Sequence, residues 1–144
     1  MAQQLKEQIA QMNDRLLRTA AEFDNFRKRT VREKEALYSD AKADTVERFL
    51  PVYDNFERAL ENECADAEFK KGVEMIFHLM QDAFEKLGVT EIGAVGEIFD
   101  PTLHNAVMHA EDEAHGENEI VSVFQKGYKI GDKVIRHAMV SVAN

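Results

Sequence analysis

The sequence is poor in the residues that interrupt helices, cross-link chains or cross membranes. It has two prolines, one cysteine and no tryptophan in 144 residues, and neither proline nor glycine occurs before Pro51. A single cysteine, Cys64, excludes a disulfide within the chain and is typical of a reducing compartment, so we expect a cytoplasmic protein. No apolar run approaches the roughly 20 residues that a membrane helix needs, so we expect no membrane partner.

Positive charge is also scarce. The formal net charge is −9, which makes nucleic acid a poor partner for the surface, and we expect none. The basic run Arg27-Lys28-Arg29 is followed by Glu33 and Glu35. We interpret this run as a solvated helix face, although a local basic patch can also dock an acidic protein.

Catalytic motifs are absent as well. The sequence has no phosphate-binding glycine loop, dinucleotide fingerprint or nucleophile elbow. The tightest group of potential zinc ligands is His109, Glu111, Asp112 and His115, which could bind a metal only if their loop folded back on itself. We expect no enzyme, no cofactor and no metal site. A metal-dependent enzyme at His109 and His115 stays an alternative, and zinc in the purified protein would reveal it.

What the sequence does contain is a long amphipathic segment from Ala2 to Val46. Its apolar residues recur at spacings of three and four, which predicts one helical face. Acid-to-base pairs four residues apart add support, at Asp14–Arg18, Asp24–Lys28 and Asp44–Arg48. No later segment is long enough to cover the stripe, so we predict a dimer with a paired-helix stalk. The predicted stalk seam consists of Leu5, Ile9, Met12, Leu16, Phe23 and Phe26.

The stripe mixes seven- and eleven-residue spacings, which predicts a nearly straight and loosely packed helix pair. Apolar residues thin out after Thr30, so we expect the Arg27–Val46 part of the stalk to melt first on heating.

Proline and glycine divide the middle of the chain. Leu50-Pro51 is expected to end or bend the first helix near Arg48 to Leu50, so that residues 1–49 form the dimerisation helix. A second helix should run from Pro51 to about Glu61, and a third from about Ala67 to Leu87, before the stop signal Gly88. Residues 50–88 would then supply two short helices per chain to a dimeric four-helix bundle. Its predicted members are Phe56, Leu60, Val73, Ile76, Phe77, Met80 and Phe84.

Gly72 is unusual because it lies inside the third predicted helix. A glycine there costs about 1 kcal/mol relative to alanine. Either this weakness is tolerated near the helix start, or a partner must approach the backbone at Gly72.

The hydrophobic period changes after Val89, so residues 89–144 are predicted to form a small all-β domain. Strands are expected at Val89–Ile92 and Glu119–Gln125, with Ile120 and Phe124 on one face of the second. A hairpin is expected around Gly131-Asp132, with Lys133–Val142 as one continuous strand. We expect His104 to bond the turn that begins at Phe99-Asp100-Pro101. The predicted fold class is therefore α+β.

Three motifs of this β-region are distinctive. They are Phe99-Asp100-Pro101-x-x-His104-x-Ala106, Val123-x-Gln125-Lys126-Gly127-Tyr128 and Ile135-Arg136-x-Ala138-x-Val140-x-Val142. These motifs resemble the GrpE family, the nucleotide exchange factors of DnaK-type heat-shock chaperones. Upstream, Glu22-Phe23-Asp24-Asn25-Phe26-Arg27-Lys28-Arg29 and Leu50-Pro51-Val52-x-Asp54-Asn55-x-Glu57-Arg58-Ala59-Leu60 are similar to the family too. The resemblance covers nearly the whole chain, although the family usually carries an acidic segment before the stalk.

The resemblance implies a parallel homodimer with a long helix pair, a four-helix bundle and two β-wings. One wing would insert at the ATPase domain of the chaperone and hold its nucleotide cleft open, so that ADP leaves. Reversible melting of the long helix would make the protein a thermosensor. The implied chaperone contacts are Phe99, Asp100, Phe124, Gln125, Lys126, Gly127, Tyr128, Lys133 and Arg136 in the wing, with Gly72, Arg27 and Arg58 on the helices. The alternative is a dimeric coiled-coil scaffold whose wing binds an unrelated protein.

Overall fold

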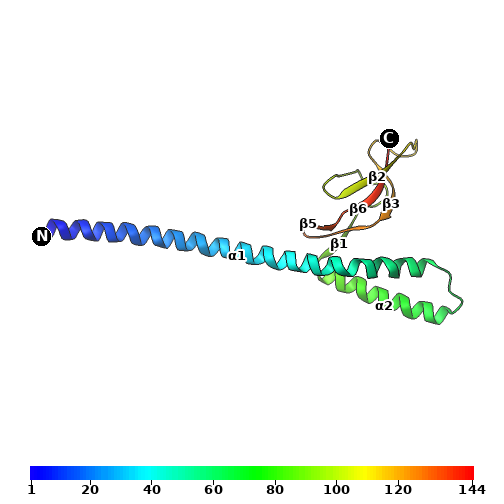
Figure 1. The fold of residues 1–144 in the computed structure, drawn as a ribbon, viewed down its shortest axis with the longest axis horizontal. Helices are drawn as coiled ribbons and strands as arrows, with labels where there is room; N and C mark the ends of the chain where they lie inside the picture. The colour runs from blue at the N-terminus through cyan, green and yellow to red at the C-terminus, as the bar shows by residue number, and fades with distance from the viewer. The chain divides into compact units, whose positions relative to one another are not determined.

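A computed structural model describes residues 1–144, which divide into two compact units, Met1–Ser39 and Asp40–Asn144. The chain forms two helices followed by six strands (Figure 1). The predicted α+β class is therefore confirmed. No helix of the chain combines the length and the apolar character that a bilayer crossing requires.

Helix α1 runs from Ala2 to Glu61 and includes the whole of the predicted stalk. In the Met1–Ser39 unit nearly every residue is exposed, and the helix is supported locally by ion pairs four residues apart. Arg18 lies 3.0 Å from Asp14, and Lys28 lies 2.9 Å from Asp24, as predicted. The third predicted pair does not form, since Asp44 lies 4.0 Å from Lys133 instead.

The prediction that one helix ends near Leu50 and a new one starts at Pro51 is wrong, because α1 continues through Pro51 to Glu61. A proline inside a helix costs about 3 kcal/mol, since it removes one hydrogen bond and its ring crowds the preceding turn. Burial offsets this cost: Val46, Leu50 and Tyr53, on either side of the proline, are at most 6% exposed. A break at Pro51 would separate side chains that pack into one core. The segment after Pro51 is thus part of α1 and not a separate short helix.

Helix α2 (Ala67–Lys86) matches the third predicted helix and lies beside the last turns of α1 (Figure 1). Asp66 caps its start, with its side chain accepting a hydrogen bond from the Phe69 N–H at 3.0 Å. Gly88 follows its end with φ +81°, the left-handed conformation that glycine adopts readily, so the predicted stop is confirmed.

The strands form two small sheets. The first has the order β1–β4–β5 and is antiparallel, with β1 at Val89–Ile92, β4 at Gly127–Ile130 and β5 at Lys133–Arg136. The second has the order β2–β6–β3, with β2 at His104–Ala110, β6 at Ala138–Ala143 and β3 at Ile120–Gln125. The hairpin at Gly131-Asp132 is confirmed as the link between β4 and β5.

Each sheet has its own core. The first sheet packs on the helices, and their shared core consists of Ala43, Val46, Leu50, Tyr53, Phe77, Phe84, Val89, Tyr128, Ile130 and Ile135. The second sheet buries Ile120, Ala138, Val140 and Val142. The β-region is thus attached to the helices through one sheet only.

The predicted single strand Lys133–Val142 is wrong, because the chain leaves the first sheet at Arg136 and enters the second at Ala138. His137 lies exposed between β5 and β6. Gly127 lies beside this crossing. A Cβ atom on Gly127 would come within 2.8 Å of the Arg136 carbonyl oxygen and 2.7 Å of Ile92 Cγ1, so no larger residue fits without movement.

Candidate protein-binding surface

Strand β3 and the last turns of α1 enclose a hollow of about 230 Å³ with an aromatic side chain at its edge. Phe124 is 56% exposed, which is unusual for a large aromatic residue in a strand. The hollow is lined by Asp54, Glu57, Arg58 and Glu61 of α1 and by Val123, Phe124, Gln125 and Lys126. An exposed apolar side chain surrounded by charged groups is suited to insertion into a protein partner.

The outward direction of Phe124 comes from irregular pairing of β3. Its register against β6 shifts between Ile120 and Ser122 and again between Val123 and Gln125. We predicted Ile120 and Phe124 on one face of the strand, but Ile120 is fully buried and Phe124 is exposed. The shifts let Ile120 and Val123 both pack into the second core and leave Phe124 outside it.

Arg136 is held by α1. Its Nη1 and Nη2 donate to the two carboxylate oxygens of Asp54 at 2.7 and 3.0 Å, and the two side chains are only 18% and 20% exposed. Its Nε and Nη2 also donate to the Lys126 carbonyl oxygen at 3.1 and 2.7 Å. The guanidinium lies 5.6 Å from the centre of the Tyr128 ring. These contacts use most of the donor capacity of Arg136 within the chain.

Lys126 also has partners within the chain. Its Nζ donates to Glu57 Oε1 at 2.8 Å and lies 3.5 Å from Glu91 Oε2. Burial lowers the pKa of Lys126, but the hydrogen bond and charge of Glu57 outweigh it, with help from Glu91, so the pKa lies above its ordinary value. Lys126 is therefore cationic at any physiological pH.

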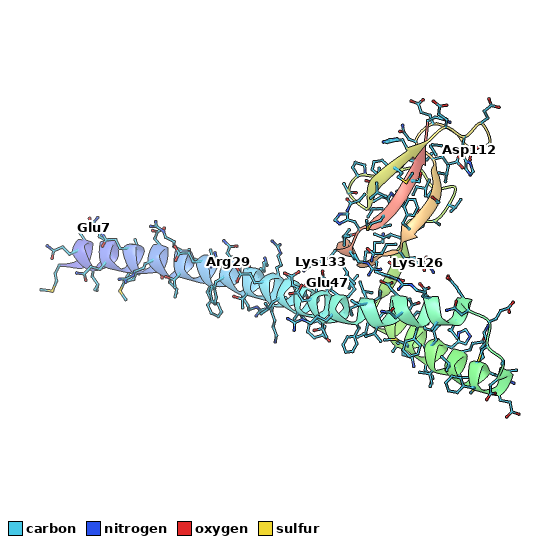
Figure 2. All side chains as sticks on the ribbon, turned by 45° about the vertical axis from the view of Figure 1, so that its right-hand side comes forward. Glu7, Arg29, Glu47, Asp112, Lys126 and Lys133 are labelled. Carbon is cyan, nitrogen blue, oxygen red and sulfur yellow. The ribbon has the colours of Figure 1, made fainter.

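Lys133 lies near an earlier turn of the same helix. Its Nζ donates to Asp40 Oδ1 at 2.9 Å, and this hydrogen bond raises the pKa of Lys133. Figure 2 shows Lys126 and Lys133 at the helix-facing end of the β-region, with Asp112 at its opposite end. Three basic residues of the β-region, Lys126, Lys133 and Arg136, thus face acidic residues of α1.

Two other predicted contact residues, Gly127 and Tyr128, are buried. Tyr128 is 3% exposed and packs edge-on against the Tyr53 ring, with 5.7 Å between ring centres. Burial raises the pKa of the Tyr128 hydroxyl strongly, and the charge of Glu57 adds to this effect. These two residues therefore lie in the interior of the β-region.

Phe99 and Asp100 form a turn, as the sequence suggested. The Asp100 carboxylate accepts hydrogen bonds from the Thr102 hydroxyl at 2.6 Å and the Thr102 N–H at 2.9 Å, which lower the pKa of Asp100. The Asp100 N–H donates to His104 Nδ1 at 3.0 Å, so the expectation that His104 bonds this turn is confirmed. Phe99 packs against the second core.

The predicted contacts on the helices are more accessible. A Cβ atom on Gly72 would meet no other atom within 4 Å, so the backbone of α2 is open to approach there. Arg58 is exposed at the hollow and its Nη1 lies 3.5 Å from Asn55 Oδ1. Arg27 is exposed in the Met1–Ser39 unit.

The predicted dimer residues fall into two groups. All six stalk residues, from Leu5 to Phe26, are 52–71% exposed, and Ile76 on α2 is 56% exposed. Phe77 and Phe84 are instead buried within the single chain, where both rings pack against Tyr53. Phe56, Leu60 and Met80 pack partly against the same core, and Val73 is half-buried. Sequence reasoning missed Phe69, Met75 and Leu79, which are 62–68% exposed on α2.

Asp54 and Glu57 are functional candidates that sequence reasoning also missed. Both stand in the motif that begins at Leu50-Pro51, but the sequence assigned them no contact. Asp54 binds Arg136, 82 positions away. A signal for this role was their place in that motif, on helix turns next to the buried Tyr53.

No group of three or more histidine, cysteine or carboxylate side chains is arranged to hold a metal ion. In the acidic loop, His115 Nδ1 lies 2.9 Å from Asp112 Oδ2. The Asp112 carboxylate also accepts a hydrogen bond from the Ala114 N–H, which, with the bond to His115, lowers its pKa.

The sequence matches the family model of GrpE over residues 1–144. The chain belongs to the GrpE family. The Protein GrpE of Clostridium acetobutylicum is 56% identical over 131 residues, which are 91% of this chain and 65% of that protein. Those of Clostridium beijerinckii and Clostridium tetani are 57% and 52% identical over 91% and 99% of this chain, and 63% and 70% of their own lengths. The chain thus spans about two thirds of these GrpE relatives.

Proposed function

We propose that this GrpE-family chain acts in the cytoplasm as a nucleotide exchange factor, binding the ATPase domain of a DnaK-type chaperone as a homodimer. The observation that carries the proposal is the exposed Phe124 at the hollow between β3 and α1, within the motif that resembles the family. Membership of the GrpE family supports the proposed activity. The unpaired, exposed Cys64 fits a reducing compartment.

The proposed mechanism is a shift in population and involves no bond making or breaking. The wing binds the open form of the chaperone's nucleotide cleft better than the closed form, so the open form becomes more populated and ADP leaves. By linkage, ADP must weaken the binding of this chain by the same factor that the chain weakens the binding of ADP.

The homodimer is supported by apolar surface that the single chain leaves uncovered. The stalk stripe is exposed along its length, as are Phe69, Met75, Ile76 and Leu79 on α2. Apolar patches of this extent are rare on monomers and mark protein interfaces. A second copy presents the same patches, so each patch can pair with its own counterpart in a homodimer.

A first test is the release of fluorescently labelled ADP from a bacterial DnaK-type chaperone. We expect the wild-type chain to accelerate release at least about tenfold, which corresponds to lowering the free-energy barrier to release by about 1.4 kcal/mol. Phe124→Asp should weaken binding about 30-fold, because it places a charge where an apolar side chain is buried in the complex. Since Phe124 is already exposed, its replacement should leave the fold intact.

A matched control is Met108→Asp, which introduces the same charge at a 57% exposed position of the same sheet. This variant should exchange as the wild type does. If the folded wild-type dimer does not accelerate the release of ADP from its cognate chaperone, the proposed exchange function is wrong. The alternative, a coiled-coil scaffold, then takes its place. Equal losses in both variants would argue against a specific role for Phe124.

A second prediction concerns Gly72 on α2. Gly72→Asp should weaken chaperone binding about tenfold by placing a charged side chain on the open helix face. The dimer should stay folded, because aspartate is no worse than glycine inside a helix. Calorimetric titration with the chaperone and analytical ultracentrifugation would measure the two effects.

Gly72→Ala separates binding from stability. Alanine should raise the free energy of unfolding by about 1 kcal/mol and weaken binding less than aspartate does. Unchanged binding of Gly72→Asp would rule out a contact at this position.

A further inference from the structure

The wing's basic side chains meet a row of carboxylates along α1. These contacts join residues far apart in sequence and lie at the point where the β-region attaches to the helices (Figure 2). The pairs are Lys133 with Asp40, Arg136 with Asp54, and Lys126 with Glu57.

The central contact, which we call the clamp, is the two-bond contact between Arg136 and Asp54. Arg136 donates to both carboxylate oxygens of Asp54 through Nη1 and Nη2, and to the Lys126 carbonyl oxygen through Nε and Nη2. Two parallel bonds fix the orientation of a guanidinium as well as its distance. Arg136 therefore connects a helix residue directly to the backbone of the segment that joins β3 to β4.

The second contact acts on the same segment. Lys126 follows Phe124 by two residues, and its ammonium group is bound by Glu57, one turn after Asp54 on α1. The main chain of Lys126 is thus held by Arg136 and its side chain by Glu57. Both restraints on the segment next to Phe124 originate from α1.

We infer that Asp54 and Glu57 are positioning residues, which hold the segment after β3 against α1 and thereby set where Phe124 meets a partner. This inference rests on the proposed exchange function. The resemblance implies that Arg136 and Lys126 contact the chaperone. In this inference both instead bind α1 and hold the segment after β3, and Phe124 makes the contact with the chaperone.

The test is a double-mutant cycle in the ADP-release assay with Asp54→Asn, Arg136→Gln and the double variant. Each single variant should raise the concentration for half-maximal acceleration about tenfold and leave the maximal rate unchanged. The double variant should be no worse than either single, because both remove the same clamp. Losses that multiply in the double variant, or a wild-type response of Asp54→Asn, would overturn the inference.

A matched control is Asp82→Asn, the same substitution at an exposed position of α2. It should leave both kinetic constants unchanged. Circular dichroism should show unchanged helix content in all of these variants, which excludes unfolding as the cause of a loss.

A distance measurement tests the positioning without the chaperone. In a Cys64→Ser background, spin labels at Asn105→Cys in β2 and Lys71→Cys in α2 report how the wing sits on the helices within the Asp40–Asn144 unit. Asp54→Asn should broaden the distance distribution, and an unchanged distribution would overturn the inference. If the wild type fails to accelerate release while this broadening occurs, the exchange function fails and the positioning by Asp54 remains.

Discussion

Replacing Leu50 by alanine is expected to lower the free energy of unfolding of the Asp40–Asn144 unit by about 3 kcal/mol. Leu50 is fully buried in the core that the helices share with the first sheet. The substitution removes apolar contacts and leaves a cavity that its neighbours Val46 and Tyr53 can fill only in part. Urea denaturation followed by circular dichroism would measure the loss.

The loss of free energy of unfolding in Leu50→Ala should be large because the core around Leu50 has two roles. It fastens the first sheet to the helices, and it keeps α1 continuous through the unfavourable Pro51. With less burial beside the proline, the last turns of α1 should loosen together with α2, and hydrogen exchange would detect this.

Leu17→Ala is the matched control, the same substitution in the same helix at a 71% exposed position. It should change the free energy of unfolding by no more than about 0.5 kcal/mol. A loss below about 1 kcal/mol for Leu50→Ala would show that the core around Pro51 contributes little.

On heating, the chain should lose its helical signal in two separate reversible steps, the first of which removes about half of it. The residues from Ala2 to Ser39 have no buried core of their own and are supported within the chain by local ion pairs. In the proposed homodimer, pairing with the second copy would add the stability that such a helix lacks by itself. The Asp40–Asn144 unit has two buried cores and should melt later.

The structure moves the expected boundary of this first step. We predicted melting of Arg27–Val46, but Ala43 and Val46 are each only 2% exposed and belong to the helix–sheet core. The melting segment should therefore end near Ser39, the last residue of the first unit. We propose that this step switches exchange off at high temperature.

Circular dichroism during heating would show the two steps, and the first should move to higher temperature as the protein concentration rises. Leu16→Asp, in the predicted seam, should lower the first midpoint by about 5 °C or more and leave the second unchanged. Leu17→Asp, at the neighbouring position, should have a smaller effect. A single cooperative loss of helix in the wild type would contradict the two-step melting.

Local sequence patterns predicted the structure correctly wherever it depends on residues that are close in sequence. The apolar spacing of α1, the capping and stop signals of α2 and the two-residue turn at Gly131-Asp132 all act within a few residues, and each is confirmed. His104 also bonds a turn only four residues away, as expected. In each case the partner lies within reach of the same segment.

Predictions failed where distant segments compete with a local preference. Pro51 is a helix breaker by itself, but tertiary burial of its neighbours keeps the helix intact. The alternation of Lys133–Val142 is continuous in sequence, although its two halves pair with different sheets. Phe124 is exposed because register shifts in β3 change the facing of its residues.

The sequence by itself determined the α+β class, the long amphipathic helix, the family and the motifs that contain the candidate contacts. Only the tertiary structure decided which of those residues are free to meet a partner. Arg136, Lys126 and Lys133 have carboxylate partners on α1, whereas Phe124 and Gly72 remain open. The physical reason is that an ion pair between residues as far apart as Asp54 and Arg136 leaves no periodic trace in the sequence, and its geometry exists only after both cores have formed.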